Sequence, residues 1–107
     1  MTTGQLIETL GLTVFNVGED REVKTGYCGD LLSQVMGRAP AGSAWITVMT
    51  NVNVVAVAIL CDTACVILAQ GMMPDENLRA RAERENLTLL GTTDDVYTAA
   101  VRLGQVL

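Results

Sequence analysis

From Ala44 to Leu107 the chain alternates between short apolar runs and longer stretches in which apolar residues recur every three or four positions. The apolar runs span residues 44–49, 64–69 and 87–90, and a helical pattern follows each of them. Short runs that are apolar throughout are typical of parallel strands covered on both faces. The pattern therefore predicts consecutive strand-then-helix units.

Small polar residues follow each predicted strand: Thr50-Asn51, Gln70-Gly71 and Thr92-Thr93. The carboxyl ends of parallel strands share one edge of a sheet, and ligands of open α/β sheets bind at that edge. We therefore expect these polar residues to mark a binding edge.

The apolar stretch 54–60 is ambiguous, because a run of valines has high β-propensity while periodicity alone does not separate a buried strand from a buried helix. Asn51 and Asn53 are good helix caps. In addition, parallel strands at 44–49 and 64–69 need a crossover between them. We therefore interpret residues 53–61 as a buried helix.

The first part of the chain predicts a helix that begins at Thr2 or Thr3 and ends at Gly11. Residues 12–17 and 22–28 have strand-like patterns, and we expect them to form a hairpin or an adjoining edge.

Asp30 is expected to cap a short helix that Gly37 ends, and either Thr93 or Asp94 to cap the last helix of the chain. The buried side of the short helix is expected to carry Leu31, Leu32, Val35 and Met36. These elements predict one domain, residues 1–107, of the α/β class: a three-layer α/β/α fold with a mostly parallel sheet built from consecutive β/α units.

Composition limits the environment and the partners. The chain has 107 residues, 50% of them hydrophobic, and a formal net charge of −5, which disfavours nucleic-acid binding. Its longest apolar run, Val54–Cys61, is too short to span a bilayer, and no secretory signal follows Met1. We expect a cytoplasmic protein with neither a membrane nor a nucleic-acid partner.

The residue inventory argues against catalysis. The chain has no histidine, so the usual general base and transition-metal ligand are missing. Neither serine, Ser33 or Ser43, lies in a Gly-x-Ser-x-Gly elbow, and no P-loop or dinucleotide fingerprint is present. The carboxylate pairs Asp75-Glu76 and Asp94-Asp95 stand at predicted helix starts, where capping explains them. We expect a protein that is not an enzyme and has no cofactor.

Cys28, Cys61 and Cys65 lack the Cys-x-x-Cys spacing of a metal site. An iron–sulfur cluster usually takes four thiolates, so three would need completion by a dimer partner or another ligand. The alternative, which we prefer, is that these residues behave as small hydrophobes.

Several segments resemble the small stand-alone members of the DRTGG domain family. These are Gly29–Gly37, Trp45–Thr47 and Asn53–Ala58. The later segments Cys65–Gly71, Pro74–Glu76 and Leu89–Thr92, with Ala82, are similar to the N-terminal domain of HPr kinase/phosphorylase, which shares the fold. The resemblance covers nearly the whole chain.

The family resemblance implies a three-layer α/β/α domain that forms homodimers and has a regulatory role next to enzymes such as pyrophosphatases with CBS domains. Small homologues in the family are also often labelled as iron–sulfur hydrogenase proteins. The signature of the family is an Asp-Arg pair and a Thr-Gly-Gly; here those places read Thr50-Asn51 and Ala69-Gln70-Gly71, so only the last glycine matches.

The residues themselves suggest a candidate site for a small anionic ligand. Of the three predicted helix starts at the strand-end edge, only the one after Thr50-Asn51 has no carboxylate, so it alone accepts an anion without like-charge repulsion. Thr50, Asn51 and Asn53 would contact the charge, with Gly71 and Thr92 as walls. The simpler alternative is that these residues are ordinary caps and turn formers.

Two functions follow from these observations. The first is a non-catalytic regulatory or ligand-sensing module, dimeric, that acts on a partner enzyme. The second is an assembly subunit of a hydrogenase-type redox complex, without a small ligand. An exposed apolar patch away from the strand-end edge would favour the second.

Overall fold

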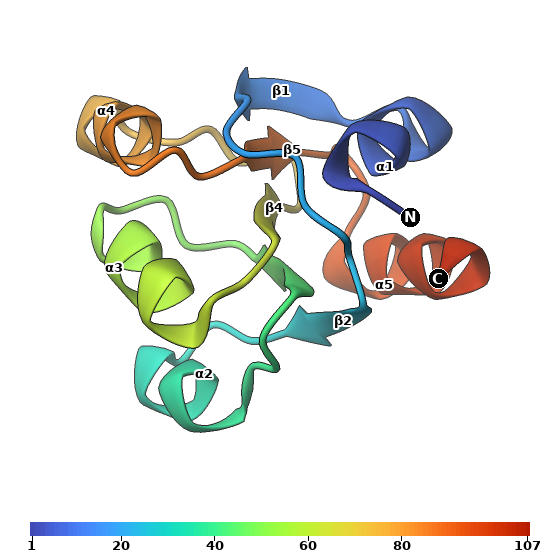
Figure 1. The fold of residues 1–107 in the computed structure, drawn as a ribbon, viewed down its shortest axis with the longest axis horizontal. Coiled ribbons are helices and arrows are strands. Elements are labelled where there is room, and N and C mark those ends of the chain that lie inside the picture. Colours follow the sequence, from blue (N-terminus) through green and yellow to red (C-terminus); the bar gives the residue numbers. More distant parts are fainter.

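The computed structural model describes residues 1–107 and contains a five-stranded sheet with five helices (Figure 1). The elements in chain order are α1 (Thr3–Leu10), β1 (Thr13–Asn16), β2 (Thr25–Cys28), α2 (Leu32–Arg38), β3 (Ser43–Thr47), α3 (Asn53–Cys61), β4 (Cys65–Leu68), α4 (Glu76–Arg84), β5 (Leu89–Gly91) and α5 (Val96–Val106). Their order confirms the predicted consecutive β/α units.

The strands lie in the order β1-β5-β4-β3-β2, and all neighbours are parallel except β1 and β5. Every residue of β3, β4 and β5 is buried, whereas the edge strands β1 and β2 have exposed residues. The three apolar runs are therefore the interior strands, as expected for a parallel sheet covered on both faces.

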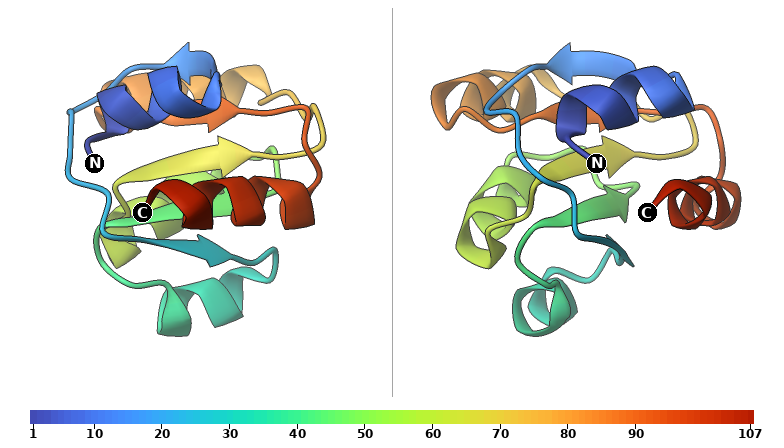
Figure 2. Two further views of the ribbon diagram at one scale, coloured as in Figure 1. Left: turned by 90° about the vertical axis from the view of Figure 1, so that its right-hand side faces the viewer. Right: turned by 45° about the vertical axis from the view of Figure 1, so that its right-hand side comes forward.

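Helices cover both faces of the sheet, so the structure has the predicted three layers (Figure 2). On one face, α1 and α5 pack over a cluster that includes Leu6, Ile46 and Leu103. On the other face, α2, α3 and α4 pack over a cluster around Trp45. The period-two alternation along β3 produces this division, because Ile46 and Trp45 point to opposite faces.

The first helix has the ends that its sequence predicts. Thr2 caps α1 and accepts a hydrogen bond from the Gln5 amide, while the Gln5 side chain accepts one from the Thr2 amide. Gly11 ends the helix in the left-handed conformation, with φ of 62°.

The ambiguous stretch is helical: α3 spans Asn53–Cys61 and buries Val54, Val55, Val57 and Ala58. It provides the crossover between β3 and the parallel β4. The topology therefore overrides the β-propensity of the valines.

The expected pairing of the first two strands is wrong, because β1 and β2 lie at opposite edges of the sheet. β1 runs antiparallel to β5, and the segment after it crosses the sheet to reach β2. That segment pairs with the N-terminus: the Thr3 amide donates to the Arg21 carbonyl, and the Val23 amide donates to the Met1 carbonyl. These contacts hold the chain away from a hairpin.

The expected cap of the short helix is also wrong. No side chain caps α2, whose N-cap residue is Leu31. Asp30 instead accepts hydrogen bonds from the Thr47 hydroxyl and the Val48 amide. Leu31 and Met36, expected on the buried side, are exposed, and the helix runs through Gly37 to Arg38.

None of the helices combines the length and apolar character needed to cross a bilayer.

Candidate functional site

The loops after β3, β4 and β5 meet at one edge of the sheet, as the strand order requires. The Asp75 amide donates to the Thr50 carbonyl over 3.1 Å, and the Gly71 amide donates to the Thr92 carbonyl over 2.9 Å. Main-chain hydrogen bonds thus join the loop of Thr50 to the start of α4, and Gly71 to Thr92.

Asn51 and Asn53 lie together at the start of α3. The Asn51 side-chain oxygen accepts a hydrogen bond of 3.0 Å from the Asn53 amide. The helix itself has Val52 as N-cap and no side-chain cap bond there, and its first turn has no acidic residue. Both asparagines are exposed, so this helix start carries only neutral polar groups.

The other two helix starts are capped by carboxylates. Asp75 accepts a hydrogen bond of 2.7 Å from the Leu78 amide, and Asp95 accepts one of 2.7 Å from the Thr98 amide. The hydrogen bond from the Thr98 amide lowers the pKa of Asp95 below its usual value of 3.8. The cap of α5 is therefore Asp95, and the expectation of Thr93 or Asp94 is wrong.

The turn after β4 has two successive residues with positive φ, Gln70 at 62° and Gly71 at 68°. Glycine adopts this conformation without steric cost, whereas glutamine does so at some expense. The geometry accounts for a glycine at position 71. It also brings the Gln70 amide to the Asp94 carbonyl, at 2.8 Å.

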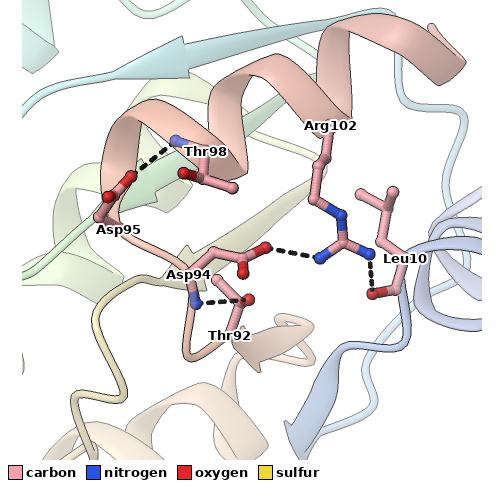
Figure 3. A network of polar contacts seen from close by, with 6 residues as sticks. All are labelled: Leu10, Thr92, Asp94, Asp95, Thr98 and Arg102. Carbon is pink, nitrogen blue, oxygen red and sulfur yellow. Dashed lines mark hydrogen bonds and ion pairs between the residues drawn. The ribbon is translucent and has the colours of Figure 1, made fainter.

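Asp94 belongs to a polar network that ties α5 to α1 (Figure 3). The Arg102 guanidinium donates to the Asp94 carboxylate over 2.5 Å and to the Leu10 carbonyl over 2.9 Å. The Thr92 hydroxyl accepts a hydrogen bond from the Asp94 amide. Thr92 thus has a structural role in the β5–α5 turn. Arg102 provides a hydrogen-bond donor for a carbonyl at the C-terminus of α1 that has no partner within the helix.

Sequence reasoning missed Asp30 at the strand-end edge. This exposed carboxylate lies beside the end of β3, where the Thr47 hydroxyl donates to it over 2.7 Å and the Val48 amide over 3.0 Å. Its negative charge counts against an anion close to Val48. Because Asp30 closely follows the predicted strand 22–28, its place at this edge could have been predicted from the sequence.

The comparisons with known proteins identify the family of the chain. The family model of the DRTGG domain matches residues 5–106. The chain belongs to the DRTGG domain family. No curated protein matches it.

The DRTGG domain is also similar to a solved structure, the CBS and DRTGG domains of the regulatory region of the Clostridium perfringens pyrophosphatase complexed with its activator, diadenosine tetraphosphate. The TM-score is 0.75 at 18% sequence identity. The alignment covers 99% of this chain and 47% of that one, so the domain spans about half the length of its structural neighbour. The likeness shows the fold.

A groove of about 480 Å³ lies in this DRTGG domain between the edge strand β2 and helix α5. Its lining residues are Lys24, Thr25, Gly26, Tyr27, Cys28, Ile46, Ala100, Leu103, Gly104 and Leu107. None of the five residues of the predicted anion site lines it. Sequence analysis did not predict this groove, because Gly26 and Gly104 are far apart in the chain and line the same groove only in the fold.

The three cysteines of the DRTGG domain are free and have different environments. Cys28 is exposed, Cys61 is partly buried at the end of α3, and Cys65 is buried in β4. Burial raises the pKa of the Cys65 thiol to about 12. No three or more Cys, Asp or Glu side chains lie close enough together to hold a metal ion.

Proposed function

We propose that this DRTGG domain is a non-catalytic regulatory module that senses a small anionic ligand, forms a dimer and acts on a partner enzyme. The observation that carries the proposal is the family match over residues 5–106. The likeness to a regulatory region that was solved with a nucleotide activator supports the choice of function.

The ligand's negative charge is placed at the start of α3. Helix N-termini attract anions through the positive end of the helix dipole, and a carboxylate at the same end opposes this attraction. Asp75 and Asp95 occupy the starts of α4 and α5, whereas α3 has the neutral Asn51 and Asn53. In this proposal Thr50 also contacts the anion.

The neighbouring loops enclose the ligand in this arrangement. Gly71 and Thr92 are joined by a main-chain hydrogen bond, and Thr50 is joined to the start of α4. These bonds make the rim of the site rigid, which lowers the conformational entropy lost on binding. The Asp30 carboxylate, which accepts a hydrogen bond from the Val48 amide, disfavours an anion directly at the end of β3.

Isothermal titration calorimetry tests the proposal with diadenosine tetraphosphate, ATP, AMP and inorganic phosphate as probes. We expect binding of at least one of the phosphate esters and a loss of about tenfold in affinity for Asn51→Asp, since the new carboxylate repels the ligand. The matched control is Asn86→Asp, which adds the same charge at an exposed position before β5, at the opposite end of the sheet.

Equal affinity of the Asn51→Asp and wild-type proteins would overturn the placement of the anion. Absence of heat with every probe would overturn ligand sensing for this class of ligand. Equal losses for both variants would point to a general charge effect and would also contradict the site.

A second candidate function, an assembly subunit of a redox complex, is favoured by one observation. The outer side of α3 exposes Ile59 (47%) and Leu60 (69%), and Met36 (48%) is exposed on the adjacent α2. Exposed apolar side chains in such a group are typical of a protein-binding surface. This function needs no small ligand, so the calorimetric experiment distinguishes it from the first.

A further inference from the structure

We infer that the outer face of α5, together with the groove beside β2, is the surface through which two copies of this chain associate. The inference rests on the dimer of the proposed function and assigns its surface. The partner is a second copy packed antiparallel on α5.

Helix α5 has apolar residues on two sides. One side, with Ala99 and Leu103, is buried against the sheet. The other side carries Tyr97, Ala100, Val101 and Gly104, which recur at the i, i+3, i+4, i+7 spacing of a helix-packing face. We call these four residues the α5 stripe.

The α5 stripe faces solvent in the single chain. The Tyr97 side chain is 79% exposed and the Val101 side chain 42%, while Gly104 is exposed and Ala100 half-buried. The helix lies on the outside of its layer (Figure 2). Covering the large, exposed aromatic side chain of Tyr97 with a partner would remove apolar surface from water and so stabilise the complex.

The groove lies directly beside this stripe, because Ala100 and Gly104 also line it. Its floor includes Gly26 of β2, where a Cβ atom would lie 2.6 Å from Leu103 Cδ2. Glycine therefore lets α5 pack tightly on the edge strand, and the short side chains of Ala100 and Gly104 leave the hollow open. At about 480 Å³ it has room for an aromatic side chain.

The charge distribution favours a second copy as the occupant. In a twofold interface each residue near the axis meets its own equivalent, so charged residues there would repel. The chain carries a net charge of −5, yet the α5 stripe has no charge, and the one charged side chain that lines the groove is Lys24, just before β2. The one charged residue of α5, Arg102, points toward α1 and is paired with Asp94 (Figure 3).

The spacing along α5 is self-complementary. If the twofold axis passes between Ala100 and Val101, Tyr97 of one copy lies opposite Gly104 of the other, because both are equally far from the axis. Tyr97 is the protruding residue and Gly104 borders the hollow. Each copy thus supplies one aromatic ring and one groove, as a closed twofold dimer requires.

Sedimentation equilibrium of the full chain tests this surface through two substitutions that the single chain tolerates. A Cβ atom at Gly104 would meet no atom within 4 Å, and replacing a helical glycine raises helix propensity. We expect wild-type protein to be dimeric and both Gly104→Glu and Tyr97→Ala to raise the dimer dissociation constant by about tenfold or more. Thermal unfolding at a concentration where all forms are monomeric should show no loss for Gly104→Glu.

The matched control is Leu60→Glu, which places the same charge on the exposed side of α3. It should leave the dissociation constant within a factor of about two. A dimer that persists in Gly104→Glu, or that Leu60→Glu disrupts to the same extent, overturns the α5 surface. A wild-type chain that is monomeric overturns the dimer as well. Neither result affects the calorimetric test of Asn51→Asp, so failure of this surface and failure of ligand sensing are separable.

Discussion

The two faces of the sheet are covered differently although their cores are nearly equal in size. Helices α2, α3 and α4 enclose 12 buried apolar residues on one face, and α1 and α5 enclose 13 on the other. The groove of about 480 Å³ lies on the two-helix face beside β2, whereas the hollow that α3 helps to line, at Ala58 and Ile59, has only about 150 Å³. The groove therefore does not come from a shortage of apolar residues.

The difference lies in where small residues stand. On the three-helix face the fully buried Trp45 fills the space between the sheet and its helices, and its indole N–H donates to the Gly29 carbonyl over 2.9 Å. On the two-helix face Gly26, Ala100 and Gly104 come together at the edge strand. Two domain faces with equal apolar content can thus differ in packing, and the looser one offers a surface to a partner.

Matched Leu→Ala substitutions should show the largest contrast between the faces. Leu78→Ala on α4 removes a fully buried side chain from the three-helix core, and we expect it to lower the free energy of unfolding by about 4 kcal/mol. Leu103→Ala on α5 also removes a buried side chain, but it should cost only about 2 kcal/mol, because Leu103 borders the groove and the space left by the truncation would open into it instead of remaining a closed cavity. Urea unfolding at a concentration where the chain is monomeric measures both. Equal losses would show that the groove has no effect on packing.

Cys65 tests whether the looser packing of the two-helix face is confined to the edge strand, because Cys65 lies on that face and is buried in the central strand β4. Its pKa is about 12 in the folded chain, against an ordinary value of 9.0. The unfolded chain therefore loses the thiol proton first, and the stability present below pH 9 should decline toward pH 12, by on the order of 2 kcal/mol at pH 10.5.

The alkaline loss is measured by urea unfolding between pH 8 and pH 10.5. Cys65→Ala should lack this component, whereas the control Cys28→Ala, at an exposed position, should retain it. Identical pH dependence in the wild-type and Cys65→Ala proteins would mean that water reaches the central strand as well as the edge.

The ion pairs on the two faces should give the smallest contrast. Arg102→Ala breaks the pair with Asp94 and the bond to the Leu10 carbonyl, which join α5 to α1, and should cost about 1 kcal/mol. Arg81→Ala breaks an exposed pair with Glu85 within α4 and should cost at most about 0.5 kcal/mol. Thermal unfolding at low and high salt measures both. A larger loss for Arg81→Ala would contradict the role of Arg102 as the tie between helices.

Much of the fold could be predicted from the sequence because local signals agreed with one another. The capped helix from Thr2 to Gly11 and the strand-then-helix units are local patterns, and the helix at 53–61 followed from the need for a crossover. The hairpin of β1 and β2 was wrong because strand pairing is not local: β1 had two candidate neighbours, and contacts between residues 21–23 and the N-terminus decided the choice.

The candidate site was predictable only in part. The strand-end edge follows from the direction of the strands, so Thr50, Asn51, Gly71 and Thr92 could be assigned to it. The cap of α5 and the hydrogen-bond partners of Asp30 could not be predicted, because neighbouring aspartates compete for the same amides and the turn geometry selects between them. Similarly, nothing local indicates that Arg102 takes Asp94 as its partner.

The sequence by itself determined the elements, their α/β order and the neutral start of α3, because periodicity, caps and turn residues act over a few positions. Only the tertiary structure decided that Gly26 and Gly104 border one groove and that the α5 stripe remains uncovered. Both depend on contacts between residues far apart in the chain, and the packing of the whole domain selects such contacts.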